Sequence, residues 1–131
     1  MTERRRSIRD QRGQTMVEFT IVLPILLLLL LGILQFGIVF NNYITLTDAV
    51  RAGARQGSVG RSVADPSGAA ISRVRASATD LDQAKLSVSV ASEWTQGADV
   101  TVTATYPYRI SLLGMVVSSG SLTSKSTERV E

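Results

Sequence analysis

The longest apolar run of the chain lies near its N-terminus. No charged residue occurs from Phe19 to Thr47, and from Ile21 to Phe40 the only strongly polar side chain is Gln35. An α-helix rises about 1.5 Å per residue, so the 20 residues of this second stretch span roughly 30 Å, the thickness of the hydrocarbon core of a bilayer. The 17 Leu, Ile, Val and Phe side chains from Phe19 to Phe40 favour insertion by about 5 to 10 kcal/mol in total. The run therefore predicts a transmembrane helix.

Helical patterning continues beyond the apolar run and predicts one rod from about Val17 to Gln56, ended by Gly57 and the turn-forming residues that follow. A second, shorter helix is predicted from about Ala69 to Asp80, where apolar residues recur at helical spacing. Pro24 lies inside the long helix. Because proline removes one helix hydrogen bond, a kink or softened turn is expected near Thr20.

The period of the apolar pattern changes to two after the second helix. Alternation predicts strands at Leu86–Val90, at Val100–Tyr106 and from Leu122 to about Arg129. Pro107 is expected to stop the second strand, and the apolar segment Ile110–Val117 is assigned to neither element type. The predicted fold class is α+β: a long N-terminal transmembrane helix that continues outside the membrane, a short helix and a small antiparallel sheet of about three strands.

Three parts follow from this pattern. Residues 1–13 form a basic leader, residues 14–56 a transmembrane and extended helix, and residues 57–131 a small exported α+β module. The module is near the lower size limit for a domain that folds by its own hydrophobic core. The chain has no cysteine, so no disulfide bond stabilises the module. Contacts with neighbouring chains are therefore a plausible source of further stability.

Positive charge gathers at the N-terminus. Residues 1–13 hold five arginines against two acidic residues, which accounts for the whole formal net charge of +3. Lys and Arg are retained on the cytoplasmic side of a membrane, so we expect the N-terminus inside the cell and the residues after about Asp48 outside. Nucleic-acid binding is disfavoured, because the apolar run follows at once and no aromatic residue interrupts the basic cluster.

Glu18 directly precedes the apolar run and lies five residues after Gly13. An ionised carboxylate at the edge of hydrocarbon needs a partner, which makes it a functional candidate. Alternatively, a negative charge in the first turn stabilises a helix by about 0.3 to 1 kcal/mol, but this does not explain a glycine that closes a basic leader. An ordinary secretory signal peptide is disfavoured too, because its apolar segment is about 7 to 15 residues long.

The stretch from Gly13 to Phe19 is similar to the prepilin-peptidase site of type IV pilin-like proteins, in which cutting follows the glycine at the cytoplasmic face. The closer resemblance is to the TadE-like proteins of tight-adherence pilus systems. It is carried by residues 12–19, by Val22-Leu23-Pro24 with the leucine run, and by a second block at Thr47–Arg55. Together these cover about residues 12–57, and the C-terminal half carries no motif of the family.

The resemblance implies a minor pilin or pilus-assembly component in a bacterial cytoplasmic membrane, with a role in adhesion or secretion. The implied partners are membrane lipid, a prepilin peptidase that cuts between Gly13 and Gln14, other pilin-like subunits and the assembly machinery. The cut would create an α-amine on Gln14, largely cationic at neutral pH. We expect this amine to pair with Glu18 of a neighbouring subunit, with a pair inside one chain as the competing version.

A different class of function also fits the sequence. The alternative to a pilus component is an uncleaved single-pass protein whose exported module acts as a sensor or adaptor. In that case the leader before Gly13 would stay attached to the transmembrane helix.

Ala49, Gly53 and Gly57 recur at intervals of four residues and form a small-residue stripe on one helical face. Such a stripe permits close approach of another backbone. The approaching element belongs either to a neighbouring subunit or, as the favoured alternative, to the sheet of the same chain.

Catalytic chemistry is poorly represented. The chain has no histidine and no cysteine, so the usual general base, thiol nucleophile and zinc ligands are missing. Asp80 and Asp82 occur at a predicted helix end and indicate surface charge and capping more than a catalytic carboxylate pair. The sequence predicts no enzyme, and no catalytic residue, metal site, cofactor or small-molecule substrate.

Overall fold

A computed structural model describes the backbone of residues 4–131 and the side chains of residues 13–131. The side chains of the predicted basic leader before Gly13 therefore lie outside the described part of the chain. The elements are α1 (Arg4–Ser58), the short 3-10 turn η1 (Gly60–Ser62), α2 (Pro66–Ser77), β1 (Ser87–Ala91), β2 (Asp99–Leu112) and β3 (Met115–Arg129). The three strands form one antiparallel sheet in the order β1-β2-β3. The predicted α+β class, with its long apolar helix, short helix and three-stranded sheet, is confirmed.

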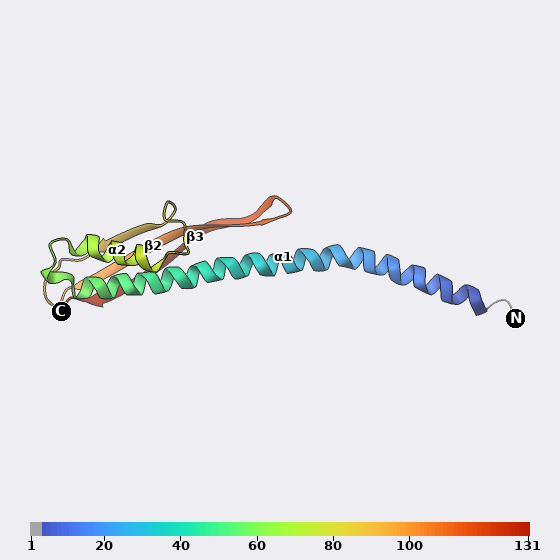
Figure 1. The fold of residues 1–131 in the computed structure, drawn as a ribbon, viewed down its shortest axis with the longest axis horizontal. Coiled ribbons are helices and arrows are strands. Elements are labelled where there is room, and N and C mark those ends of the chain that lie inside the picture. The colour runs from blue at the N-terminus through green and yellow to red at the C-terminus, as the bar shows by residue number, and fades with distance from the viewer. Residues whose placement is uncertain (1–3) are drawn as a thin grey trace.

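The helix α1 is a single rod that sets the shape of the molecule. Its 55 residues correspond to a length of about 80 Å. Figure 1 shows α2 and the sheet against the C-terminal part of α1, while the N-terminal half extends alone. The helix continues through Pro24, and the same view shows only a gentle curve in this half.

The hydrophobic core lies between the C-terminal part of α1, α2 and one face of the sheet. Its largest fully buried side chains are Leu46, Val50, Val74, Val100 and Val102. The strand β2 alternates buried and half-buried residues from Val100 to Ala104, as expected for a strand with one face on a core. The core is built from small side chains, so its stability depends on close packing between the elements.

The helix α2 begins three residues before the predicted start at Ala69. Asp65 is the N-cap residue and accepts a hydrogen bond from the Gly68 amide at 2.9 Å, and Pro66 occupies the first helical position. Proline is preorganised for that position, and a capping aspartate satisfies one of the free amides of the first turn. The Asp-Pro pair, which was expected to belong to a turn, therefore starts the helix.

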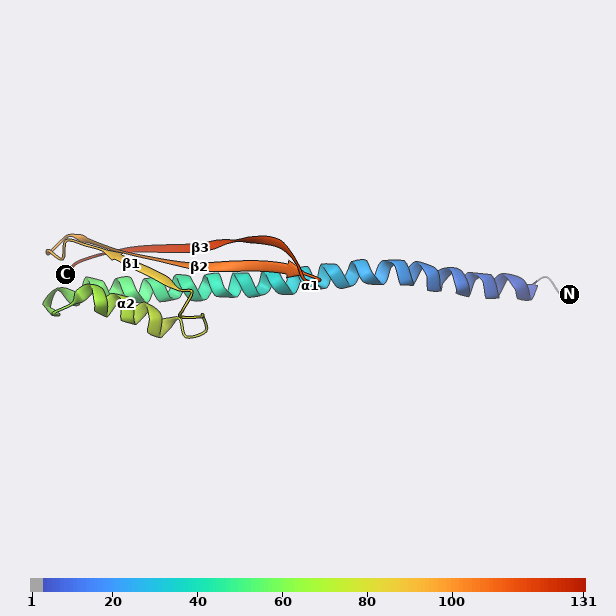
Figure 2. The same ribbon diagram turned by 90° about the horizontal axis from the view of Figure 1, so that it is seen from above.

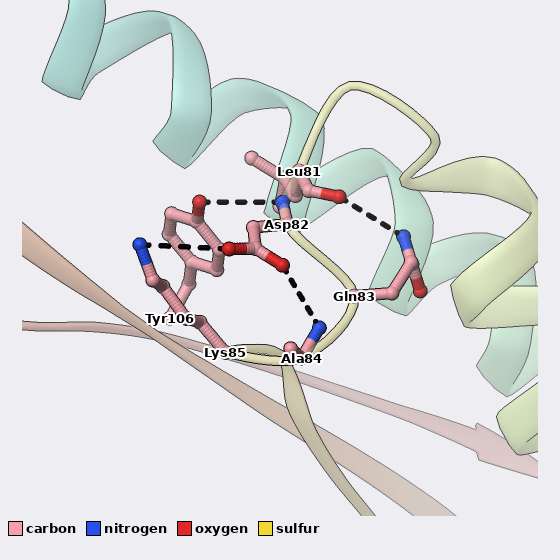
Figure 3. A network of polar contacts seen from close by, with 6 residues as sticks. All are labelled: Leu81, Asp82, Gln83, Ala84, Lys85 and Tyr106. Atoms are coloured by element: carbon pink, nitrogen blue, oxygen red, sulfur yellow. Dashed lines mark hydrogen bonds and ion pairs between the residues drawn. The ribbon is translucent and has the colours of Figure 1, made fainter.

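Polar contacts hold the loop between α2 and β1 (Figure 3). The Asp82 carboxylate accepts a hydrogen bond from the Ala84 amide at 3.0 Å and lies 3.5 Å from Lys85 Nζ. The Asp82 amide donates to the Tyr106 hydroxyl of β2 at 3.3 Å, while Gln83 Nε2 donates to the Ala78 carbonyl at 2.8 Å. The loop is thereby tied both to the end of α2 and to the sheet.

The prediction that Pro107 stops the second strand is wrong. The strand β2 continues through Pro107 to Leu112, and the ladder with β3 includes the pair Pro107–Ser121. The strand β1 pairs with β2 only as far as Thr105, so β2 has a neighbour on one side alone at the proline. A proline is tolerated on an open edge because no ladder hydrogen bond is lost there.

The unassigned segment Ile110–Val117 forms the end of a long β2–β3 hairpin. Leu112 and Met115 are the last paired residues, and the two residues between them, Leu113 and Gly114, have φ angles of 51° and 82°. Two consecutive positive φ values are typical of a type I′ turn, which matches the twist of a hairpin and favours glycine at its second position. The third strand therefore begins seven residues before its predicted start at Leu122.

Candidate processing and assembly segment

The N-terminal part of α1 is exposed between residues 13 and 30. Figure 1 shows this part of the helix extending away from the module. Within the described residues, α1 is the one helix long and apolar enough to cross a membrane. Because this surface is too apolar to remain in water, the arrangement fits a single-pass membrane protein.

Glu18 lies on this exposed part of α1, at the edge of the apolar run. Its Oε1 atom accepts a hydrogen bond of 3.0 Å from Nε2 of Gln14, one helical turn earlier. The partner is an amide, so it satisfies a lone pair of the carboxylate without neutralising the charge. Side chains at positions 14 and 18 thus share one helix face, and the carboxylate remains open to an additional, cationic partner.

Gly13 lies within α1, and a Cβ atom built there would meet nothing within 4 Å. The same is true of Gly32 and Gly37 on the exposed half of the helix. Packing inside the chain therefore does not require glycine at any of these positions. Glycine is about 1 kcal/mol less favourable than alanine in a helix interior, so a reason for Gly13 has to be sought outside the folded chain.

The small-residue stripe packs against the same chain in this structure. Ala49 is fully buried. A Cβ atom at Gly53 would clash with Cγ2 of Val74 on α2 and would lie 3.2 Å from the Ala70 carbonyl oxygen. At Gly57, it would lie 2.7 Å from Cγ1 of Val100 on β2. Both glycines therefore allow α1 to approach α2 and the sheet closely.

Sequence reasoning missed the exposed apolar end of the β2–β3 hairpin. Leu113, Met115, Val116 and Val117 are all more than half exposed. The signal was present in the chain, since a glycine follows Leu113 between two short apolar runs. The residues on both sides are apolar, however, so neither a period of two nor a polar turn marked the hairpin.

A metal site on the described part of the chain would need a cluster of metal-binding side chains. No group of three or more His, Cys, Asp or Glu side chains there could hold a metal ion. The carboxylates of Asp48, Asp82 and Asp99 form exposed ion pairs with Arg51, Lys85 and Arg129, respectively. Such surface pairs contribute about 0 to 1 kcal/mol each and need no functional explanation.

A comparison with protein-family models matches residues 13–55 to the family described as TadE-like protein. The resemblance noted in the sequence is thus confirmed over these residues, which include the exposed half of α1 and most of its packed part. No curated protein and no solved structure matches the chain. The match covers α1 from Gly13 to Arg55 and includes neither α2 nor the sheet.

We predict that Gly53→Ala destabilises the module. The added methyl group meets the buried, β-branched Val74 and the backbone of Ala70, and overpacking of this kind costs about 1 to 3 kcal/mol. Thermal unfolding of the full-length protein in detergent, followed by circular dichroism, measures the change. Gly37→Ala is the matched control, because its methyl group meets nothing within 4 Å. Equal stability of the two variants would contradict the close packing of α1 on α2.

Proposed function

We propose that this chain is a structural, pilin-like subunit of a tight-adherence pilus or of its assembly machinery, anchored in a bacterial cytoplasmic membrane by α1. The observation that carries the proposal is the overlap of two features. The family match starts at Gly13, and the apolar side chains of α1 that follow are exposed as far as residue 30. A subunit of this kind exposes such a helix first to lipid and then to the helices of other subunits.

The proposed orientation places the arginine-rich N-terminus in the cytoplasm and the α2–sheet module outside. Its support is the arginine content of residues 1–13, which hold five arginines, whereas residues 49–61 on the other side of the apolar run hold three. In this orientation Gly13 and Glu18 lie near the cytoplasmic face, and the module faces the space in which a pilus grows.

A prepilin peptidase is the proposed processing enzyme, and it would cut between Gly13 and Gln14. Hydrolysis consumes one water molecule and leaves a carboxylate on Gly13 and an amine on Gln14. Both residues are helical in this structure, so α1 has to unwind locally before the bond can enter a peptidase site. A glycine suits this step, because it is a weak helix former and has no Cβ atom to hinder the approach of the enzyme.

The new amine on Gln14 is the proposed cationic partner of Glu18. An α-amine has a pKa of about 7.7 to 8.0 and is largely charged at neutral pH. If the amine of one subunit meets Glu18 of its neighbour as helices pack side by side, both charges are neutralised in an apolar setting. Such a pair also sets the axial register of the helices, as a lone polar residue does in coiled coils.

A second candidate function is a permanently anchored sensor or adaptor that is never cut. Like the pilin-like subunit, such a protein has a transmembrane helix and an exported module. In it, however, no cut after Gly13 creates an amine that could pair with Glu18. The state of the N-terminus therefore separates the two candidates.

The processing proposal predicts that the membrane-extracted protein begins at Gln14 when the complete pilus system is present. Intact mass spectrometry measures this directly. Gly13→Leu should leave the leader attached, because a large side chain hinders both unwinding and entry into the site. Gly37→Leu, another glycine of α1 with no neighbour within 4 Å, should be cut normally. A mature mass that runs from Met1 to Glu131 in the unsubstituted protein would favour the permanent anchor.

The pairing proposal predicts that Glu18→Gln harms assembly far more than insertion or cutting. Loss of one member of a buried ion pair costs about 3 to 5 kcal/mol, so surface pili should fall by at least tenfold. The apolar side chains that hold α1 in lipid are unchanged, so the membrane level should stay the same. Asp48→Asn removes an exposed carboxylate from the same helix and serves as the control. Normal pili and normal crosslinking to other pilins in Glu18→Gln would refute the pair.

A further inference from the structure

The β2–β3 hairpin projects well beyond the rest of the sheet. The strand β1 ends its pairing with β2 at Thr105, whereas β2 and β3 stay paired from Tyr106–Leu122 to Leu112–Met115. At about 3.3 Å per residue, the seven residues from Tyr106 to Leu112 extend by roughly 23 Å. Figure 2 shows this two-stranded extension running along α1 toward its N-terminal half.

The end of this extension is apolar, uncharged and exposed. Leu113, Met115, Val116 and Val117 are 71%, 70%, 54% and 63% exposed. No charged residue occurs between Arg109 and Lys125. Four large apolar side chains around one turn are rarely left in water unless they bind something. We call residues 110–117 the hairpin tip.

The hairpin covers α1 where the predicted transmembrane run ends. Leu31, Gln35, Val39 and Asn42 are half-buried and recur at intervals of three or four residues, whereas residues 13–30 are all exposed. Both ribbon views show the turn between β2 and β3 beside the light-blue part of α1, and we attribute the partial burial of this stripe to the hairpin (Figures 1 and 2). The apolar run ends at Phe40, and two asparagines follow.

The position of this stripe fixes how deep the hairpin reaches. Gln35 lies five residues before Phe40 and Leu31 lies nine before it, which corresponds to about 7 to 14 Å along the helix axis. Apolar elements that lie in the membrane interface sink about 5 to 10 Å into the boundary between headgroups and acyl chains. With Ile21–Phe40 as the roughly 30 Å span, the hairpin tip therefore lies below the headgroups, in the half of the hydrocarbon core next to the module.

We infer that the hairpin tip inserts into the lipid leaflet on the side of the membrane where the module lies. Membrane lipid is the occupant, because α1 carries the tip to the bilayer and the large side chains of the tip are apolar and exposed. The open edges of a two-stranded ribbon cannot enter the hydrocarbon core deeply, which limits insertion to the tip. Tyr108 and Arg109, just before the tip, have the chemistry of residues that settle at headgroups.

This second lipid contact would hold the module against the membrane before assembly. A subunit that leaves the bilayer has to withdraw the tip as well as α1. The inference rests on the proposed membrane anchoring by α1 and does not depend on cutting, on Glu18 or on the pilus itself. The test below separates failure of the tip from failure of the anchor.

The chain has no cysteine, so single cysteines can carry an environment-sensitive fluorophore without background. The full-length protein is reconstituted in vesicles of phosphatidylethanolamine and phosphatidylglycerol, with or without nitroxide groups on the acyl chains. Leu113→Cys is the test position, Ile33→Cys on exposed α1 is the membrane reference, and Thr95→Cys in the β1–β2 loop is the distal control. We expect quenching by the nitroxide lipids and a blue-shifted emission at positions 113 and 33, and neither change at position 95.

Quenching at position 33 without quenching at position 113 would overturn lipid insertion by the tip and leave the membrane anchor intact. Absence of quenching at both positions would overturn the anchor and the tip together. A blue shift at position 113 that nitroxide lipids do not quench would also overturn the inference, because the tip would then lie against protein. Val116→Asp in the Leu113→Cys background supplies a further check, since an added charge should abolish the quenching.

Discussion

The apolar surface of α1 must leave water along two stretches, and each stretch needs a different medium. From residue 13 to residue 30 the helix is exposed on all sides, and only lipid or other apolar helices can cover such a surface. From Leu46 onward one face is buried by α2 and the sheet. Because both stretches belong to one continuous helix, the position of the module relative to the membrane follows from the helix itself.

The packed stretch of α1 approaches α2 and the sheet closely because it contains two glycines at the contact. Gly53 and Gly57 bring the helix axis close to Val74 and Val100, so a module of modest size forms a core without a disulfide. The loop contacts of Asp82 and Gln83 then connect the end of α2 with Tyr106 of β2. In the exposed stretch, glycine is not needed for packing, because a Cβ atom at its glycines would meet nothing within 4 Å. The large apolar side chains there suit a lipid environment.

Much of the fold could be predicted from the period of apolar residues. The long helix was predicted from its unbroken apolar run, whereas the short helix and the three strands were predicted because each buries one face and repeats its apolar residues. The errors occurred where burial is one-sided or absent. Pro107 was expected to end the second strand. It lies on an open edge of β2, where its missing N–H group removes no ladder hydrogen bond. The hairpin tip had no polar face and so no period.

The candidate site was identified in a different way. Gly13 and Glu18 were identified from a local motif, and the family match covers both positions. The geometry of one chain adds that Gln14 and Glu18 share a helix face and that no intrachain packing requires Gly13. It does not supply a cationic partner for Glu18, since the proposed partner arises from a cut and comes from a second subunit. The lipid contact that we propose for the hairpin could not be predicted, because it depends on how far β2 and β3 run along α1.

The account depends most on α1 crossing the membrane with the arginine-rich end in the cytoplasm. A reporter enzyme that is active only outside the cytoplasm, fused after Glu131, measures this directly. The account predicts an active reporter, because the module and the C-terminus then lie on the far side of the membrane. A fusion that is stably made and remains in the membrane but is inactive would contradict it.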